Sequence, residues 1–267
     1  MAYEVIVLDL DGTLTNSKKE ITPRTKEALF RIQEEGVRVV LASGRPTPGV
    51  MPLARELRLE EYGGYILSYN GARIINVATE KLIYNAAIPK ELIPEIYEAS
   101  KEFATGIITY TKDKIVVGSK LDEYIAIEQG INKIPYWIPE DFVGTITFPV
   151  NKFLLTGDGE RMEVVVTELQ KRFGEKLNIF RSEPFFIEIM PPNIDKAYSL
   201  SKLLEHLHYS RKQMICCGDG FNDISMLRYA GLGVAMANAQ PEVKAVADYI
   251  TLSNEEDGVA AVIEKFI

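Results

Sequence analysis

Two aspartates directly after an apolar run are the residues of this sequence best placed to do chemistry. The run Val5–Leu8 predicts a buried strand, and Asp9 and Asp11 follow it. Because one residue separates the two aspartates, their side chains project to the same side of an extended chain. Like charges this close need a cation or a shared proton, and Mg²⁺ prefers carboxylate oxygen. The alternative interpretation is a solvated acidic turn, since Asp-Gly is a common turn dipeptide.

A second acidic glycine turn repeats this arrangement near the other end of the chain. Met214–Cys217 is a short apolar run that leads into Gly218-Asp219-Gly220-Phe221-Asn222-Asp223. Apolar residues at helical spacing follow, so Asn222 and Asp223 are expected near a helix start, where backbone N–H groups favour anions. Capping of that helix would explain one of these residues but not the whole set.

Two weaker signals lie between the acidic clusters. A strand candidate at 37–42 leads into Ser43-Gly44-Arg45, where a hydroxyl beside a glycine can donate to phosphate; a plain serine turn is the alternative. Lys196 falls in the first turn of a helix predicted over about 196–207, where the helix dipole disfavours a cation. A surface lysine is the ordinary explanation, but a lysine in that place is better explained if it faces an anionic ligand or carboxylates.

Strand and helix patterns alternate at both ends of the chain. In residues 1–83 the predicted strands are 5–8, 37–42 and 65–68, with helices at about 22–35 and 52–57, and residues 190–267 continue the alternation. Such βαβ alternation predicts an α/β core with a Rossmann-like parallel sheet, whose ligand crevice lies at the carboxyl ends of the strands. Between them, helix candidates at 90–103, 120–130 and 159–173 alternate with hairpin-like strands, which predicts a separate α+β unit.

In this order and spacing, the four motifs resemble motifs one to four of the haloacid dehalogenase (HAD) superfamily of phosphohydrolases. Their combination resembles its Cof-type branch, subclass IIB, and the motifs are Asp9–Leu14, Ser43–Arg45, Lys196 and Gly218–Asp223. Asn70–Ala72 and Glu256–Val259 also resemble that branch, so the resemblance covers the whole chain. One departure is Ala197, where these proteins often carry glycine.

The resemblance implies a fold and a set of roles. The implied fold is a discontinuous HAD core domain over 1–83 and 190–267 with a C2-type cap domain inserted over 84–189, which covers the active site and selects substrates. Asp9 would attack phosphorus, and Asp11 would act as general acid and base. The implied ligands of Mg²⁺ are Asp9, the backbone carbonyl of Asp11, Asp219 and, directly or through water, Asp223. The implied phosphate-binding residues are Ser43, Gly44, Lys196 and Asn222.

Composition limits the classes of function. The 267 residues are 46% hydrophobic, enough for a large core, and carry a net charge of −8, which argues against nucleic-acid binding. The first residues lack a basic segment and the apolar run stops at Asp9, so neither a signal peptide nor a membrane span is expected, and the expected location is cytoplasmic. Cys216 and Cys217 are adjacent in a predicted buried strand and are expected to pack in the core.

The sequence therefore predicts a Mg²⁺-dependent phosphatase that hydrolyses small phosphomonoesters, with sugar phosphates favoured, through an aspartyl-phosphate intermediate. A phosphomutase of the phosphomannomutase type and a non-catalytic sugar-phosphate-binding regulatory protein are the alternatives. A dinucleotide-dependent oxidoreductase is disfavoured, because no Gly-x-Gly-x-x-Gly follows the first strand. The expected partner is a small phosphorylated metabolite, not nucleic acid or membrane, and the chain is expected to be a monomer or a weak homo-oligomer.

Overall fold

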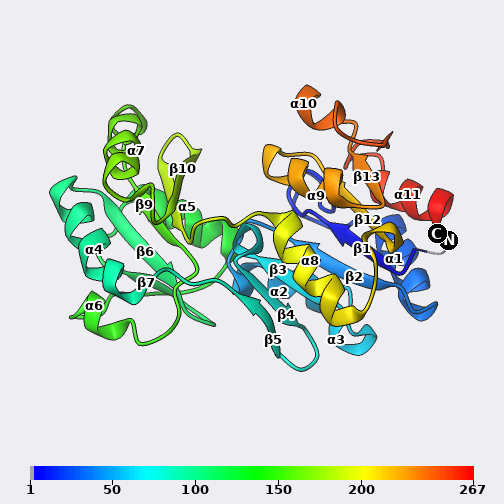
Figure 1. The fold of residues 1–267 in the computed structure, drawn as a ribbon, viewed down its shortest axis with the longest axis horizontal. Helices are drawn as coiled ribbons and strands as arrows, with labels where there is room; N and C mark the ends of the chain where they lie inside the picture. The colour runs from blue at the N-terminus through cyan, green and yellow to red at the C-terminus, as the bar shows by residue number, and fades with distance from the viewer. Residues whose placement is uncertain (1–2) are drawn as a thin grey trace. The chain divides into compact units, whose positions relative to one another are not determined.

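The computed structural model describes residues 3–267 and divides them into two compact units (Figure 1). The first unit comprises the chain up to Tyr84 together with Asp195–Ile267, and the second unit is the continuous segment Asn85–Ile194. The predicted boundary between residues 189 and 190 would separate Met190 from the rest of strand β11 (Phe186–Met190), which belongs to the sheet of the second unit. The division therefore lies a few residues later, after that strand has ended.

The first unit is built on an eight-stranded sheet in the order β14-β13-β12-β1-β2-β3-β4-β5. Its strands are β1 (Val5–Leu8), β2 (Arg38–Ala42), β3 (Tyr65–Ser68), β4 (Arg73–Asn76), β5 (Leu82–Asn85), β12 (Met214–Gly218), β13 (Leu232–Ala235) and β14 (Tyr249–Ile250). Strand β1 pairs in parallel with β2 on one side and with β12 on the other. The two ends of the chain therefore share one sheet, as the alternation predicted.

The strands that the alternation predicted pair in parallel, as expected, but a further strand makes the sheet mixed. Strand β4 runs antiparallel to β3, because no crossover helix separates them. The chain reverses through the short 3₁₀ segment η1 (Tyr69–Gly71), in which all three residues have positive φ. Such backbone is uncommon for Tyr69, whereas Asn70-Gly71 is a dipeptide that favours turns and is the local signal for this reversal.

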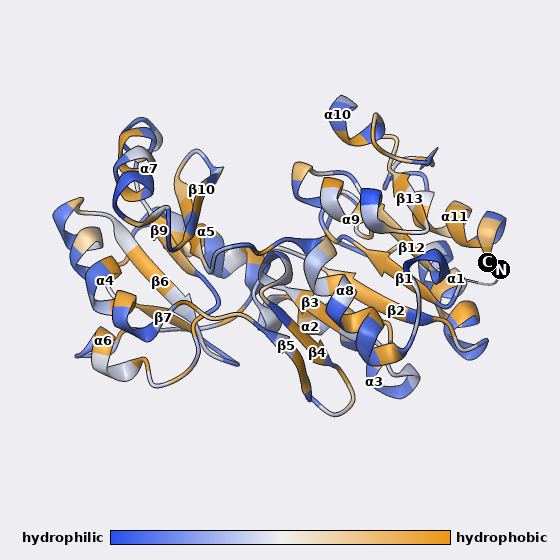
Figure 2. Ribbon diagram, in the orientation of Figure 1, coloured by the Kyte–Doolittle hydropathy of each residue, from blue (hydrophilic) through white to orange (hydrophobic). Residues whose placement is uncertain are grey.

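Helices cover both faces of the first sheet. They are α1 (Pro23–Glu34), α2 (Thr47–Glu56), α3 (Leu59–Tyr62), α8 (Lys196–Leu207), α9 (Ile224–Tyr229), α10 (Pro241–Lys244) and α11 (Gly258–Phe266). Leu8 packs with residues of α1, α2 and α11 in one core, and Val7 packs with residues of α8 and α9 in another. Because successive strand residues point to opposite faces, a strand covered on both sides is largely apolar, and β1, β2 and β3 are mostly orange in Figure 2.

In the first unit, the start of one helix differs from its prediction, and the two cysteines lie where they were predicted. Helix α2 begins at Thr47 instead of near residue 52, and Pro48 lies in its first turn, where a missing N–H leaves no helical hydrogen bond unmade. Cys216 and Cys217 are buried free cysteines on opposite faces of β12, as expected of core residues.

The second unit has its own sheet and its own core. Its six strands, in the order β10-β11-β9-β6-β7-β8, are β6 (Gly106–Tyr110), β7 (Ile115–Val117), β8 (Tyr136–Trp137), β9 (Phe153–Thr156), β10 (Asn178–Glu183) and β11. Its helices are η2 (Lys90–Leu92), α4 (Ile93–Glu102), α5 (Glu123–Asn132), α6 (Phe142–Thr145) and α7 (Gly159–Phe173). Residues of α4 and α7 form one apolar core with Ile107, Phe153 and Ile187 of the sheet. The very short β8 and α6 had no pattern long enough to predict them.

A membrane span is not among these elements. In the described part of the chain, residues 3–267, every helix is too short or too polar to cross a bilayer.

Candidate active site

Parallel pairing brings the two acidic motifs to one edge of the first sheet. Leu8 of β1 is paired with Cys217 of β12, so Asp9 and Asp219 both lie just past the carboxyl ends of neighbouring strands. The backbone N–H of Asp9 donates to the carbonyl of Cys217 at 3.1 Å, which extends the pairing to that edge. This edge is where ligands bind in open α/β sheets.

Lys196 joins two of the carboxylates. Its Nζ donates to Oδ1 of Asp9 and to Oδ1 of Asp223, both at 2.6 Å, and to the carbonyl of Ala42 at 2.9 Å. The lysine side chain is completely buried at the first residue of α8, whose start is capped by the Asp195 side chain. Two carboxylates therefore hold a cation at a helix end where the dipole opposes it.

Asp223 uses both of its oxygens. While Oδ1 binds Lys196, Oδ2 accepts from the backbone N–H groups of Asp219 and Gly220, at 3.0 Å each. These bonds cap the short 3₁₀ turn η4 (Phe221–Asp223) that precedes α9. Asp223 therefore both caps the turn and belongs to the site. Its carboxylate is fully buried, and these hydrogen bonds fix its position.

Gly12 lets the first acidic loop pass close to the second. Its φ is +90°, a conformation that side chains rarely adopt, and a Cβ added there would overlap the Asp219 carboxylate. Thr13, the next residue, donates its hydroxyl to Oδ1 of Asp219 at 2.7 Å. The two loops therefore support one another, and Thr13 is a site residue that the sequence analysis included in a motif without giving it a role.

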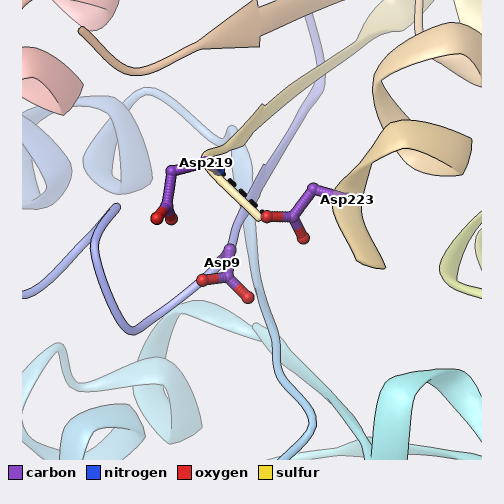
Figure 3. A group of neighbouring side chains, drawn as sticks. All are labelled: Asp9, Asp219 and Asp223. Carbon is purple, nitrogen blue, oxygen red and sulfur yellow. Dashed lines mark hydrogen bonds between the residues drawn. The ribbon is translucent and has the colours of Figure 1, made fainter. Parts of the chain in front are cut away.

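Three carboxylates converge at this edge, from Asp9, Asp219 and Asp223 (Figure 3). One oxygen from each lies within 4.8 Å of the others, and this is the group in residues 3–267 with the composition and spacing to hold a metal ion. Three carboxylates and the one ammonium of Lys196 leave a charge of −2. A donor set made only of oxygens with that charge fits a hard divalent cation such as Mg²⁺.

Burial is the largest influence on the pKa values of these groups. Burial, and then the charge of Asp223, raise the pKa of Asp9 well above its ordinary value although Lys196 opposes the shift. Burial also raises the pKa of Asp219 to about 6, with the Thr13 hydrogen bond opposing it and the charge of Asp223 adding to it. For Lys196, burial alone would lower the pKa, but the two carboxylates outweigh burial and raise it. The ammonium of Lys196 is thus firmly charged.

The Asp11 side chain binds cations of its own, outside the three-carboxylate group. Arg45 donates from Nε to Oδ2 at 2.8 Å and from Nη2 to Oδ1 at 2.5 Å, and Lys19 donates to Oδ1 at 2.8 Å. Burial would raise the pKa of Asp11, but these two cations outweigh burial and lower it. In the sequence Arg45 stands out only as part of a motif, and no local pattern relates Lys19 to Asp11.

The remaining predicted site residues lie on loops that meet at the same edge. Ser43 follows β2, is buried, and accepts a hydrogen bond on Oγ from the backbone N–H of Arg45. A Cβ on Gly44 would lie 3.1 Å from the side-chain oxygen of Asn70, so the two loops touch there. Asn222 donates to that same oxygen of Asn70 at 3.1 Å. Asn70 thereby connects the loops after β2, β3 and β12, a role that its sequence motif did not reveal.

Comparisons with known proteins show the family to which this chain belongs. A family model described as haloacid dehalogenase-like hydrolase matches residues 6–263. The chain is similar to a haloacid dehalogenase-like hydrolase from Bacteroides thetaiotaomicron, with 52% identity, a TM-score of 0.96 and coverage of 99% of this chain and 100% of that one. It is 31% identical to the 5-amino-6-(5-phospho-D-ribitylamino)uracil phosphatase YcsE of Bacillus subtilis over 99% of this chain and 96% of YcsE.

A further solved structure resembles this one over its whole length. It is the HAD subclass IIB sugar phosphatase BT4131, with a TM-score of 0.80, 26% identity and coverage of 98% of each chain. The chain therefore belongs to the haloacid dehalogenase-like hydrolases and is a Cof-type phosphatase of that family.

Proposed function

We propose that this protein is a Mg²⁺-dependent phosphatase that hydrolyses small phosphomonoesters, chiefly sugar phosphates, through an aspartyl-phosphate intermediate on Asp9. The observation that carries the proposal is the group formed by Asp9, Asp219 and Asp223, whose charge of −2 remains after Lys196 is counted. When bound there by these carboxylates and the backbone carbonyl of Asp11, Mg²⁺ supplies the positive charge that lets a carboxylate approach an anionic phosphate.

In the first step a carboxylate oxygen of Asp9 forms a bond to phosphorus, and the bond from phosphorus to the alkoxide of the substrate breaks. Asp11 supplies the proton that the alkoxide needs. In the second step Asp11 takes a proton from water, which attacks the acyl phosphate and releases inorganic phosphate and free Asp9. Ser43, Gly44 and Asn222 bind the phosphoryl oxygens, where charge stabilisation contributes most of the catalysis. The three N–H groups of Lys196 already donate to Asp9, Asp223 and the carbonyl of Ala42, so Lys196, predicted to bind phosphate directly, contributes its charge instead.

The preference for sugar phosphates is supported by two relatives. BT4131 is a sugar phosphatase, and YcsE acts on a phosphorylated ribityl compound. We assign residues 85–194 the role of a cap that selects the substrate, because this segment carries its own sheet and core and none of the predicted catalytic side chains. A cytoplasmic location and a monomeric or weakly homo-oligomeric state stay predictions.

The test is a panel of phosphorylated metabolites with release of inorganic phosphate as the readout. We expect Mg²⁺ to support turnover, excess chelator to abolish it and added Mg²⁺ to restore it. The variant Asp9→Asn should form no phosphoenzyme, because an amide is a poor nucleophile and cannot give the acyl phosphate. Full turnover in chelator would refute the metal, and a trapped phosphoenzyme in Asp9→Asn would refute the nucleophile. Isomerised sugar phosphate with little free phosphate would identify a phosphomutase instead, and binding without turnover a regulatory protein.

A further inference from the structure

We infer that Arg45 is a positioning residue for the reaction, which holds the Asp11 carboxylate so that its Oδ2 atom exchanges the proton with the leaving group. The inference rests on the proposed function and names a residue and an atom that the proposed function leaves open. It is carried by the hydrogen bonds around Asp11.

Arg45 grips both oxygens of the carboxylate. Its Nε donates to Oδ2 at 2.8 Å and its Nη2 to Oδ1 at 2.5 Å, so the planar guanidinium defines the plane of the planar carboxylate. Lys19 adds a single bond to Oδ1 at 2.8 Å. The Lys19 side chain is 58% exposed and the Arg45 side chain only 13%, so Arg45 is the more firmly placed of the two cations.

The backbone of Arg45 is itself anchored at both polar groups. Its N–H donates to Oγ of Ser43 at 3.1 Å, and its carbonyl accepts from the N–H of Tyr69 at 3.0 Å. Arg45 therefore connects the loop after β2 to the Asp11 carboxylate, which lies on the loop after β1. Asp11 would otherwise be free to turn, because its side chain is 37% exposed.

Counting acceptor sites identifies the oxygen that remains available. An ionised carboxylate offers about two lone pairs on each oxygen. Among the described residues, Oδ1 accepts from both Lys19 and Arg45, which fills it, whereas Oδ2 accepts from Arg45 alone. One acceptor position on Oδ2 is thus left for the proton that Asp11 exchanges with the substrate. The guanidinium fixes the plane of the carboxylate and therefore the direction in which this position points.

The experiment compares two leaving groups in purified Arg45→Met, with the sugar phosphate that the enzyme hydrolyses best and with p-nitrophenyl phosphate. An alkoxide needs a proton to depart, but nitrophenolate does not. We expect kcat for the sugar phosphate to fall ~100-fold, in line with the usual contribution of general acid catalysis, and kcat for the aryl phosphate to change less than about threefold. Arg45→Lys keeps the charge without the two-pronged contact and should not restore the ratio of the two rates.

Lys19→Met is the matched control, since it removes a cation from the same carboxylate but leaves Oδ2 and its plane untouched. Its ratio of alkyl to aryl kcat should stay within about threefold of the parent. Asp11→Asn should give the same ratio of alkyl to aryl kcat as Arg45→Met. The double variant should show no further change in that ratio, because both substitutions remove the same proton transfer.

Equal losses on the two substrates in Arg45→Met, or a rise in KM alone, would overturn the inference and make Arg45 a structural or phosphate-binding residue. A ratio changed as strongly in Lys19→Met would also overturn it. Circular dichroism and the Tm of each variant establish that it is folded. Failure of the proposed function is distinguishable, because the parent enzyme would then release no phosphate from either substrate.

Discussion

At the scale of single residues, Asp219 is the carboxylate of the cluster that Lys196 does not bind. Its side chain accepts a hydrogen bond from Thr13, and burial raises its pKa from an ordinary value of 3.8 to about 6. A raised pKa means that the folded protein holds this proton more tightly than the unfolded chain does. The corresponding stabilisation is fully present below about pH 4 and is lost as the pH rises through about 6.

We therefore expect Mg²⁺ to stabilise the protein more at about pH 7.5 than at about pH 5, because a proton and the cation compete for Asp219. The measurement is the gain in Tm on adding Mg²⁺ to metal-free protein at each pH. In Asp219→Asn the gain in Tm at about pH 7.5 should shrink. At that pH in chelator, the free energy of unfolding of this variant should exceed that of the parent by about 1 kcal/mol, a value reduced because solvent screens the partly exposed carboxylate. The same gain at both pH values would contradict the assignment of Asp219 as a ligand.

At the scale of elements, the start of helix α8 is what assembles the cluster. Asp195 caps the helix, and this places Lys196 at the first helical residue, with its ammonium between Asp9 and Asp223. The N-terminus of a helix normally repels a cation, but here two buried carboxylates would repel each other far more strongly without it. The helix is therefore positioned by charge as well as by the packing of Leu200 and Leu203 against the sheet.

Replacing Lys196 by Met should lower the free energy of unfolding by about 3–5 kcal/mol in chelator, because removal of one partner leaves buried carboxylates without compensation. The control on the same helix is Lys202→Met, whose exposed pair with Glu205 should contribute less than about 0.5 kcal/mol. Urea denaturation of the two variants and the parent provides the comparison. Losses of similar size in both variants would show that Lys196 does not offset the buried charge.

At the scale of the whole molecule, the two units differ in how they are assembled from the chain. Strand β1 of the first unit pairs with β2 and with β12, so this unit needs segments from both ends of the sequence. The second unit is one continuous segment, 85–194, with a six-stranded sheet and a core of its own. A continuous segment with its own core can fold alone.

We expect the isolated segment 85–194 to fold and to unfold cooperatively on heating, without phosphatase activity, because Asp9, Lys196 and Asp219 all lie in the first unit. Circular dichroism would follow the transition. Phe153 is completely buried in the core of the segment, so Phe153→Ala should lower its free energy of unfolding by about 3–5 kcal/mol. The unfolding transition of this variant should disappear or move to a much lower temperature. An isolated segment with the spectrum of an unfolded chain would contradict the prediction.

The sequence by itself determined the features that one short segment encodes. Apolar runs ending in acids located β1 and β12, and parallel alternation implied that their carboxyl ends meet, which predicts Asp9 and Asp219 at one edge of the sheet. The position of Lys196 against the helix dipole indicated a partner for it. These predictions succeeded because strand pattern, helix start and residue spacing are local properties that a folded chain retains.

Only the tertiary structure decided which side chains pair. Lys196 reaches an aspartate 187 residues away, Arg45 reaches Asp11 across 34 residues, and Asn222 meets Asn70 across 152. Such partners depend on the order of strands in the sheet and on backbone at positive φ, as at Tyr69, which a tyrosine rarely adopts. Charge alone would have allowed Asp11 to join the metal cluster or to leave it; the fold places Arg45 within reach, and the two-pronged ion pair then holds the carboxylate apart.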